Sequence, residues 1–158
     1  MDKEFAEVIT KYARIIIEKL IAKYDELGLR ASGLYAEELE YEVDRTTLII
    51  WGAFHSQFME SGRRAGGRPP IPSIIRWIET KKGLPPSMLR DKRRVAFAIA
   101  NKIAKEGIDV PNQYNRGEVI TMVVNEFLAK DIFNMLDDIG LIVRRNLQAE
   151  IGEIFKAA

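Results

Sequence analysis

The segment GLYAEELEYEVDRTTLIIWGAF (residues 33–54) decides the fold class of the chain. Its first half alternates glutamates with apolar residues, which is the two-residue period of a strand with one wet face. The apolar face consists of Leu39, Tyr41 and Val43. DRT then offers turn chemistry and TLIIW is rich in strand-forming residues, so we expect a β-hairpin over roughly residues 35–43 and 46–52. Two strands alone are marginally stable in water, so the hairpin must pack on helices or be extended by another chain.

Helical patterns surround the hairpin. Apolar residues recur every three or four positions from Asp2 to Leu27, so a long N-terminal helix is expected within residues 1–28. One short helix should follow Pro70 and end at Gly83, and a second should end at Gly107. A long helix covers the tail, with Gly140 as the expected kink. The sequence thus predicts a single α+β domain over residues 1–158, with a small antiparallel sheet packed against the N-terminal helix, two short central helices and a long C-terminal helix.

The bulk composition excludes several classes of function. The chain has 24 basic and 23 acidic residues, so its net charge of +1 gives no overall field that attracts DNA or an anionic membrane. Any electrostatic role must therefore be local. The absence of cysteine excludes disulfides and thiolate metal sites and fits a reducing compartment. Because the apolar runs are short and interrupted by charges, we expect neither a membrane span nor a targeting segment.

Few residues are suited to catalysis or metal binding. His55 is the only histidine, and its place beside Phe54 and Phe58 is typical of a partly buried residue at the end of a strand. Asp137 and Asp138 are adjacent on a helix, so they point apart and cannot form a catalytic pair. The alternating glutamates of the hairpin could bind a hard cation, although such rows are more often solvated or part of a charged interface. We therefore expect no enzyme activity, no cofactor and no metal site.

The loop SGRRAGGRPP (residues 61–70) concentrates arginine and glycine. It lacks the Lys-Ser/Thr pair of a P-loop, and it does not lie at the strand-to-helix turn of a dinucleotide-binding unit. What remains is a flexible cationic loop with Arg63, Arg64 and Arg68. Such arginines are commonly solvated, and the alternatives left open are contacts with a neighbouring subunit or with DNA.

Several short motifs occur in a specific order along the middle of the chain. A hairpin start and an aromatic corner are formed by Ser32, Gly33, Leu34, Phe54, Phe58, Glu60 and Gly62. The two short helices carry Pro69, Pro70, Ile71, Trp77, Ile78, Lys82 and Gly83, then Phe97, Ile99, Ala100, Lys102, Ile103, Glu106 and Gly107. Together they resemble the bacteriophage neck and minor tail-component family of tailed phages, whose members join the head to the tail or terminate the tail tube. The resemblance covers roughly residues 30–110, and the helical extension 116–158 departs from it.

The resemblance implies a structural virion protein, made in the host cytoplasm, that acts as a head–tail connector or tail terminator. Such a subunit is expected to form a sixfold or twelvefold ring with neck, portal-side and tail-tube neighbours, with DNA in the channel and no membrane. Arg63, Arg64, Arg68, Glu60 and Gly62 would then lie at subunit or lumen surfaces. We expect Trp51, Trp77, Phe97 and Ile103 in the core. The alternative is a small nucleic-acid-binding module that uses these loop arginines together with Lys92, Arg93 and Arg94.

Overall fold

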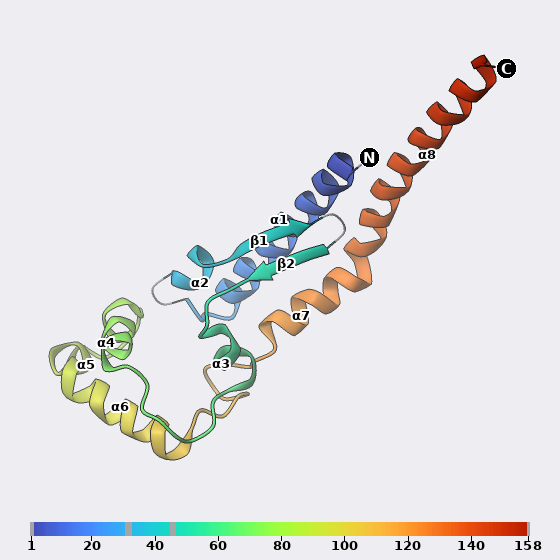
Figure 1. Cartoon of the computed structure of the whole chain (residues 1–158). Coiled ribbons are helices and arrows are strands. Elements are labelled where there is room, and N and C mark those ends of the chain that lie inside the picture. Colours follow the sequence, from blue (N-terminus) through green and yellow to red (C-terminus); the bar gives the residue numbers. More distant parts are fainter. Residues whose placement is uncertain (1, 31–32, 45–46, 158) are drawn as a thin grey trace.

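A computed structural model describes residues 2–30, 33–44 and 47–157 of the chain (Figure 1). It contains one two-stranded antiparallel sheet among helices, which confirms the α+β class. The elements, in chain order, are α1 (Asp2–Glu26), α2 (Leu34–Glu37), β1 (Glu40–Asp44), β2 (Thr47–Trp51), α3 (Ser56–Ser61), α4 (Ile71–Thr80), α5 (Pro86–Arg90), α6 (Lys92–Glu106), α7 (Val119–Glu126), the π-helical turn η1 (Phe127–Asp131) and α8 (Ile132–Ala157).

The hairpin lies along α1 and turns one face toward that helix (Figure 1). Antiparallel pairing sets Tyr41 opposite Ile50 and Val43 opposite Leu48, and these four side chains are half-buried. The positions between them are exposed, as the two-residue period of a strand requires. The predicted inward face of β1 is therefore confirmed. The turn predicted at residues 44–46 includes 45 and 46, which lie outside the described residues.

The body of the protein is built where α1 packs on α7 and α8. Its buried apolar residues include Ile9, Tyr12, Ala13 and Leu20 from α1, and Val119, Val123 and Phe127 from α7 and η1. Ion pairs then follow the length of the contact, with Lys19 Nζ at 2.6 Å from Asp131 Oδ2 and Lys11 Nζ at 2.7 Å from Asp138 Oδ2. Because residue numbers fall along α1 as they rise along α8, the two helices run antiparallel.

The second packing unit is the segment 63–106, which contains α4, α5 and α6 and which we call the basic lobe (Figure 1). Ile74 and Ile78 lie one turn apart on α4 and pack against Ala96 and Ala100, which lie one turn apart on α6. Small residues on one helix let the other approach closely. Half-buried apolar side chains surround this core: Ile71, Ile75, Leu84, Met88, Val95 and Ile99.

The aromatic residues expected in the core are exposed, so that expectation is wrong for the chain alone. Trp51 is 57% exposed, Trp77 40% and Phe97 42%, and Phe54 reaches 79%. Trp51 follows the inward-facing Ile50 and so lies on the outer face of β2. Trp77 precedes the buried Ile78, and Phe97 follows the buried Ala96. Because one step along a helix turns a side chain by about 100°, both aromatic side chains lie off the buried side of their helix. Ile103, the fourth expected core residue, is half-buried.

The structure also differs from the prediction in several local elements. The segment expected to open the first strand is the helical turn α2, where Tyr35 is buried and stacks on Tyr24 with 4.3 Å between ring centres. Gly33, in the left-handed region at φ 85°, starts this turn. In the tail, Gly140 lies within regular α-helix and the irregularity is η1. The helices α3 and α5 lie in segments where no helix was expected.

Candidate assembly surfaces

The loop after α3 and the segment after α6 meet in a short antiparallel bridge that joins the lobe to the body. The Arg63 backbone N–H donates to the Ile108 carbonyl at 2.8 Å, and the Ile108 N–H donates to the Arg63 carbonyl at 2.7 Å. Gly62 and Gly107 flank the bridge, each at φ 80°. A Cβ on Gly62 would overlap the Ile108 carbonyl oxygen, and one on Gly107 would overlap that of Arg63. Both glycines therefore serve close backbone packing, and we call this region the glycine joint.

Glu60, near the end of α3, holds that helix to the start of α7. Its Oε2 accepts a hydrogen bond from the Ile120 backbone N–H at 2.9 Å. Its Oε1 accepts from the backbone N–H and the hydroxyl of Thr121, at 2.9 and 2.6 Å. These are free donors of the first turn of α7, so the carboxylate caps that helix from a distant part of the chain. Glu60 and Gly62, predicted to lie at an interface or lumen, thus have structural partners inside the chain.

The three loop arginines have different surroundings in the structure. The Arg63 guanidinium donates to the Gly67 carbonyl at 2.5 Å and lies 5.7 Å from the centre of the Phe58 ring. Arg64 and Arg68 are exposed. Arg63 therefore belongs to the glycine joint, while an interface role for Arg64 and Arg68 stays a prediction.

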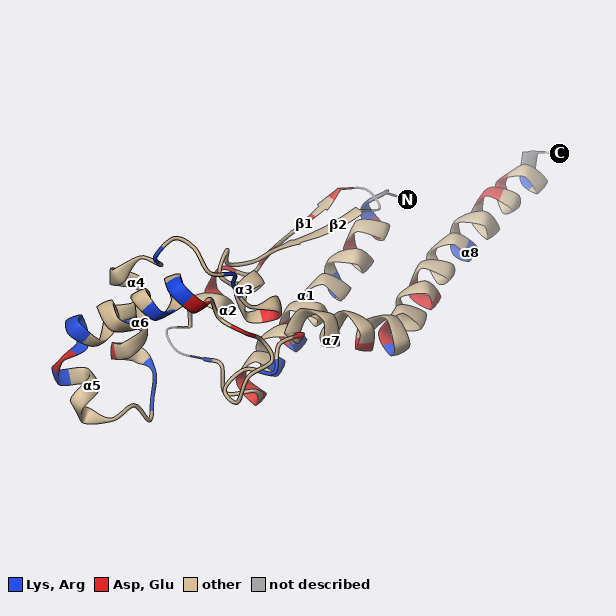
Figure 2. Cartoon of the chain, turned by 90° about the horizontal axis from the view of Figure 1, so that it is seen from below, with Lys and Arg blue, Asp and Glu red and all other residues tan. Residues whose placement is uncertain are grey.

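The basic lobe holds most of the positive charge that the rest of the chain lacks. Residues 63–106 contain 12 Lys and Arg against 3 Asp and Glu, a net charge of +9. The remainder therefore has 12 basic against 20 acidic residues, a net charge of −8. Figure 2 shows basic positions at the end of α5 and along α6. The whole-chain charge of +1 conceals this division, and a count by segment would have found it in the sequence.

The first turn of α6 carries Lys92, Arg93 and Arg94. Positive charge at a helix N-terminus opposes the helix dipole by about 0.3–1 kcal/mol per residue, so helix stability does not explain these side chains. Lys92 Nζ pairs with Glu79 Oε1 at 2.5 Å. Arg93 and Arg94 are exposed, and neither forms a hydrogen bond or ion pair within the described part of the chain.

The outward side of the hairpin has the opposite charge. The pairing sets Glu40 opposite Trp51 and Glu42 opposite Ile49, and all four side chains are exposed. Neither strand contains Lys or Arg, and the exposed Glu37 and Glu38 of α2 lie just before β1. We call the outward residues Glu40, Glu42, Asp44, Thr47, Ile49 and Trp51 the hairpin face.

A third uncovered surface follows α8. Asp131, Asp138 and Arg145 form ion pairs with residues of α1, so they mark the side of the tail that faces this helix. Residues spaced by three and four positions lie on the far side: Phe133, Leu136, Gly140, Val143, Leu147, Ile151 and Ile154. The six large ones are exposed, and the stripe is roughly 30 Å long. The end of α8 extends beyond the start of α1 (Figure 1).

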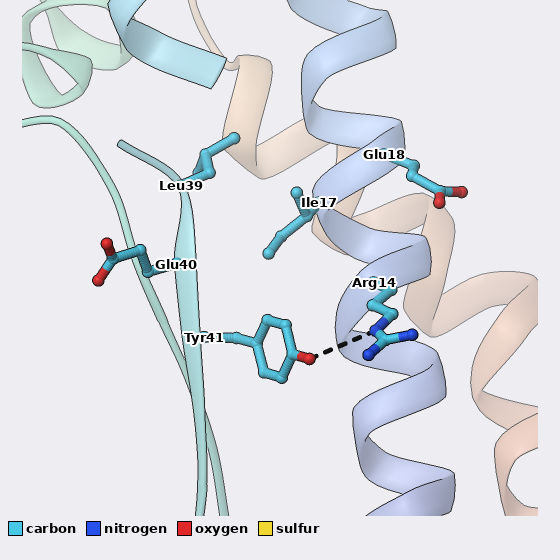
Figure 3. Close-up of a pocket in the computed structure, with 6 residues that line it drawn as sticks. All are labelled: Arg14, Ile17, Glu18, Leu39, Glu40 and Tyr41. Atoms are coloured by element: carbon cyan, nitrogen blue, oxygen red, sulfur yellow. Dashed lines mark hydrogen bonds between the residues drawn. The ribbon is translucent and has the colours of Figure 1, made fainter. Parts of the chain in front are cut away.

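Two hollows in the surface are lined by polar side chains. One of about 480 Å³ lies between α1 and β1, where Arg14 Nε donates to the Tyr41 hydroxyl at 3.3 Å (Figure 3). Its two carboxylates, on Glu18 and Glu40, point in opposite directions in Figure 3, so they do not converge. Within residues 2–30, 33–44 and 47–157, no group of three or more His, Cys, Asp and Glu side chains could hold a metal ion.

The other hollow, of about 680 Å³, lies between the lobe and the body. Trp77 and Tyr114 line it, and Lys81 Nζ closes one side by donating to the Gly28 carbonyl at 2.5 Å. His55 also lines it and is exposed, rather than partly buried as expected. Its lining has aromatic and cationic groups but no carboxylate, so it lacks an acid–base pair.

None of the helices in the described part of the chain combines the length and the apolar character needed to cross a membrane. Comparisons with models of known protein families, with curated proteins and with solved structures gave no match.

Proposed function

We propose that the chain is a structural virion protein of a tailed bacteriophage, a ring-forming neck or tail-completion subunit that joins the DNA-filled head to the tail. Its work is mechanical: it adapts the head vertex to the tail and helps to retain packaged DNA. It is not an enzyme and uses no cofactor. The motif order between residues 30 and 110 motivates the family, and the surface of the chain supports an assembling subunit.

The observation that carries this proposal is the amount of uncovered apolar surface. The accessible area is 11175 Å², whereas a compact monomer of 18.0 kDa exposes roughly 8,000 Å². Among the residues that the structure describes, seventeen large apolar side chains are exposed, while the buried apolar set has fourteen members, four of them alanine. Surface of this kind is typical of chains that bury it against partners.

Ring closure would account for the exposed aromatic residues. Trp51, Trp77 and Phe97 lie on the hairpin, at the hollow beside the lobe and on α6, so one contact cannot cover them all. In a head-to-tail ring each subunit offers different surfaces to its two neighbours. We propose six or twelve copies for this ring, the symmetries that the family resemblance implies.

One observation favours a second candidate function, a small nucleic-acid-binding module. The net charge of +9 on the basic lobe, to which the loop arginines contribute, suits a polyanion. This alternative predicts that the isolated chain binds duplex DNA with an affinity that falls steeply with salt. It gives no role to the exposed hairpin face or to the stripe along α8.

Loss of the chain during phage growth tests the proposal. An amber codon early in its gene should yield DNA-filled heads and separate tails in a non-suppressing host, and tailed particles in a suppressing host. Electron microscopy of the lysates distinguishes the two. Normal tailed, infectious particles from the non-suppressing host would contradict the proposal. Portal, capsid and tail-tube genes beside this gene are the rapid check.

A further inference from the structure

Two exposed surfaces of the chain match in charge and in chemistry. We infer that the basic lobe of one copy docks on the hairpin face of the next copy, a contact that rests on the ring proposed above. The lobe has a net charge of +9, and the segment 37–44 has five acidic residues and no basic one. Opposite potentials of this kind steer association and fix which surfaces meet.

Each surface also carries an apolar anchor among its charges. On α6, the exposed residues Arg94, Phe97, Asn101 and Lys105 follow one another at spacings of three and four and form one stripe. Phe97 is 42% exposed in these cationic surroundings. On the hairpin face, Trp51 and Ile49 lie directly across from Glu40 and Glu42. An aromatic centre with a charged rim is the usual organisation of a protein–protein contact.

The excess exposed area of the whole chain, which includes the stripe along α8, leaves room for two such contacts. The chain exposes about 3,000 Å² more than a compact monomer of its mass. A standard interface removes roughly 800 Å² from each partner, so a subunit with two neighbours needs about 1,600 Å². Because the lobe and the hairpin are different parts of the chain, each copy can give its lobe to one neighbour and its hairpin to the other. Such contacts propagate head to tail and close into a ring.

A second copy explains more of the molecule than DNA does. DNA would neutralise the lobe, yet it would leave the acidic hairpin face and the exposed Trp51 without a partner. DNA would also be repelled by the net charge of −8 on the rest of the chain. Contact between copies covers both charged surfaces at once. Binding of DNA to the lobe is therefore the competing outcome of the test.

Charge reversal provides two matched variants. Arg93→Glu with Arg94→Glu reverses the charge of the first turn of α6 and lowers the net charge of the lobe from +9 to +5. That turn tolerates the change because acidic residues there favour the helix dipole. Glu40→Lys with Glu42→Lys reverses the hairpin face at two exposed positions. Controls with the same change in net charge use exposed residues outside both surfaces: Lys3→Glu with Arg116→Glu, and Glu7→Lys with Glu150→Lys. Circular dichroism verifies that all four variants fold.

Sedimentation velocity of each variant alone, and then of the lobe and hairpin variants mixed in equal amounts, gives the result. Each charge-changed variant alone should assemble about a hundredfold more weakly, because its replaced side chains then face groups of the same sign and the attraction between the two surfaces falls. The controls should assemble like the wild type. The mixture should assemble again when the two variants alternate around the ring. Glu-bearing lobes then dock on Lys-bearing hairpins, and native lobes dock on native hairpins. Alternation of two chains closes rings of six or twelve.

Failure of this contact is distinguishable from failure of the ring. Reversed variants that assemble like the wild type, or a mixture that stays dissociated, overturn the docking and leave the ring to other surfaces. If the lobe variant still assembles but no longer shifts the anisotropy of a labelled DNA duplex, the lobe serves nucleic acid and the docking is wrong. A wild-type chain that stays monomeric at every concentration contradicts the docking and the proposed ring together.

Discussion

Arg63 in the glycine joint and Arg93 on the first turn of α6 carry the same charge in very different surroundings. The guanidinium of Arg63 donates to the Gly67 carbonyl and lies over the Phe58 ring, and its backbone is paired with Ile108. Arg93 is exposed on a helix turn that its charge destabilises. Residues of the joint therefore stabilise the fold of one chain, while the exposed residues of the lobe are available to bind a partner. Changes at the joint should lower stability, and changes at the lobe surface should alter assembly.

The largest loss of stability is expected from Gly107→Ala in the joint. Its positive φ and the overlap of a new Cβ with the Arg63 carbonyl should lower the free energy of unfolding by about 3–5 kcal/mol. Urea denaturation measures the loss. Gly140→Ala is the matched control, because its Cβ meets nothing within 4 Å and alanine favours a helix by about 0.5–1 kcal/mol. Equal effects at the two glycines would show that the joint is not closely packed.

Within the lobe, Ile78→Ala should lower the free energy of unfolding more than Trp77→Ala does, although it removes fewer atoms. Ile78 is fully buried between α4 and α6, so its truncation should lower the free energy of unfolding by about 3 kcal/mol. Trp77 is 40% exposed, so Trp77→Ala should lower the free energy of unfolding of the monomer by about 1–2 kcal/mol. Thermal and urea denaturation of both variants at a concentration where the chain is monomeric give the comparison. The reverse order would mean that Trp77 belongs to the core.

Glu60→Ala tests the distant cap of α7. It leaves the Ile120 and Thr121 backbone N–H groups without their acceptor, which should cost about 2 kcal/mol. Glu60→Gln keeps one acceptor oxygen and should lose roughly half as much. Hydrogen exchange at these two amides, read by NMR, should accelerate in the alanine variant. Unchanged exchange would refute the cap.

The smallest effect is expected at Tyr35, whose buried hydroxyl has no hydrogen-bond partner among the described residues. Tyr35→Phe should raise the free energy of unfolding by about 1 kcal/mol at neutral pH. Burial, with a smaller effect from the Glu60 charge, raises the pKa of Tyr35 from 10.0 to about 12. The folded chain therefore keeps this proton while the unfolded chain loses it, and wild-type stability falls as pH rises from about 10 to 12. The phenylalanine variant should lose less over that range, and identical pH profiles would contradict this account.

Local periodicity was sufficient to predict α1, the inward face of the hairpin and the α+β class. It could not predict that Trp51, Trp77 and Phe97 are exposed. The period identifies an apolar position, but it does not show whether that side chain is buried within its own chain or against a partner. The cap by Glu60 joins residues about sixty positions apart, and the joint pairs Arg63 with Ile108, so neither leaves a local pattern. The division of charge between lobe and body was readable from the sequence, but only by segment.

The salt dependence of the wild-type mass in solution tests most directly whether copies join through surfaces of opposite charge. Sedimentation velocity at low salt should show a closed assembly of six or twelve copies. The assembly should dissociate as salt rises from about 0.1 M to 1 M, because the screening length falls from roughly 10 Å to 3 Å. A monomer at low salt, or an assembly whose mass does not respond to salt, would contradict the account.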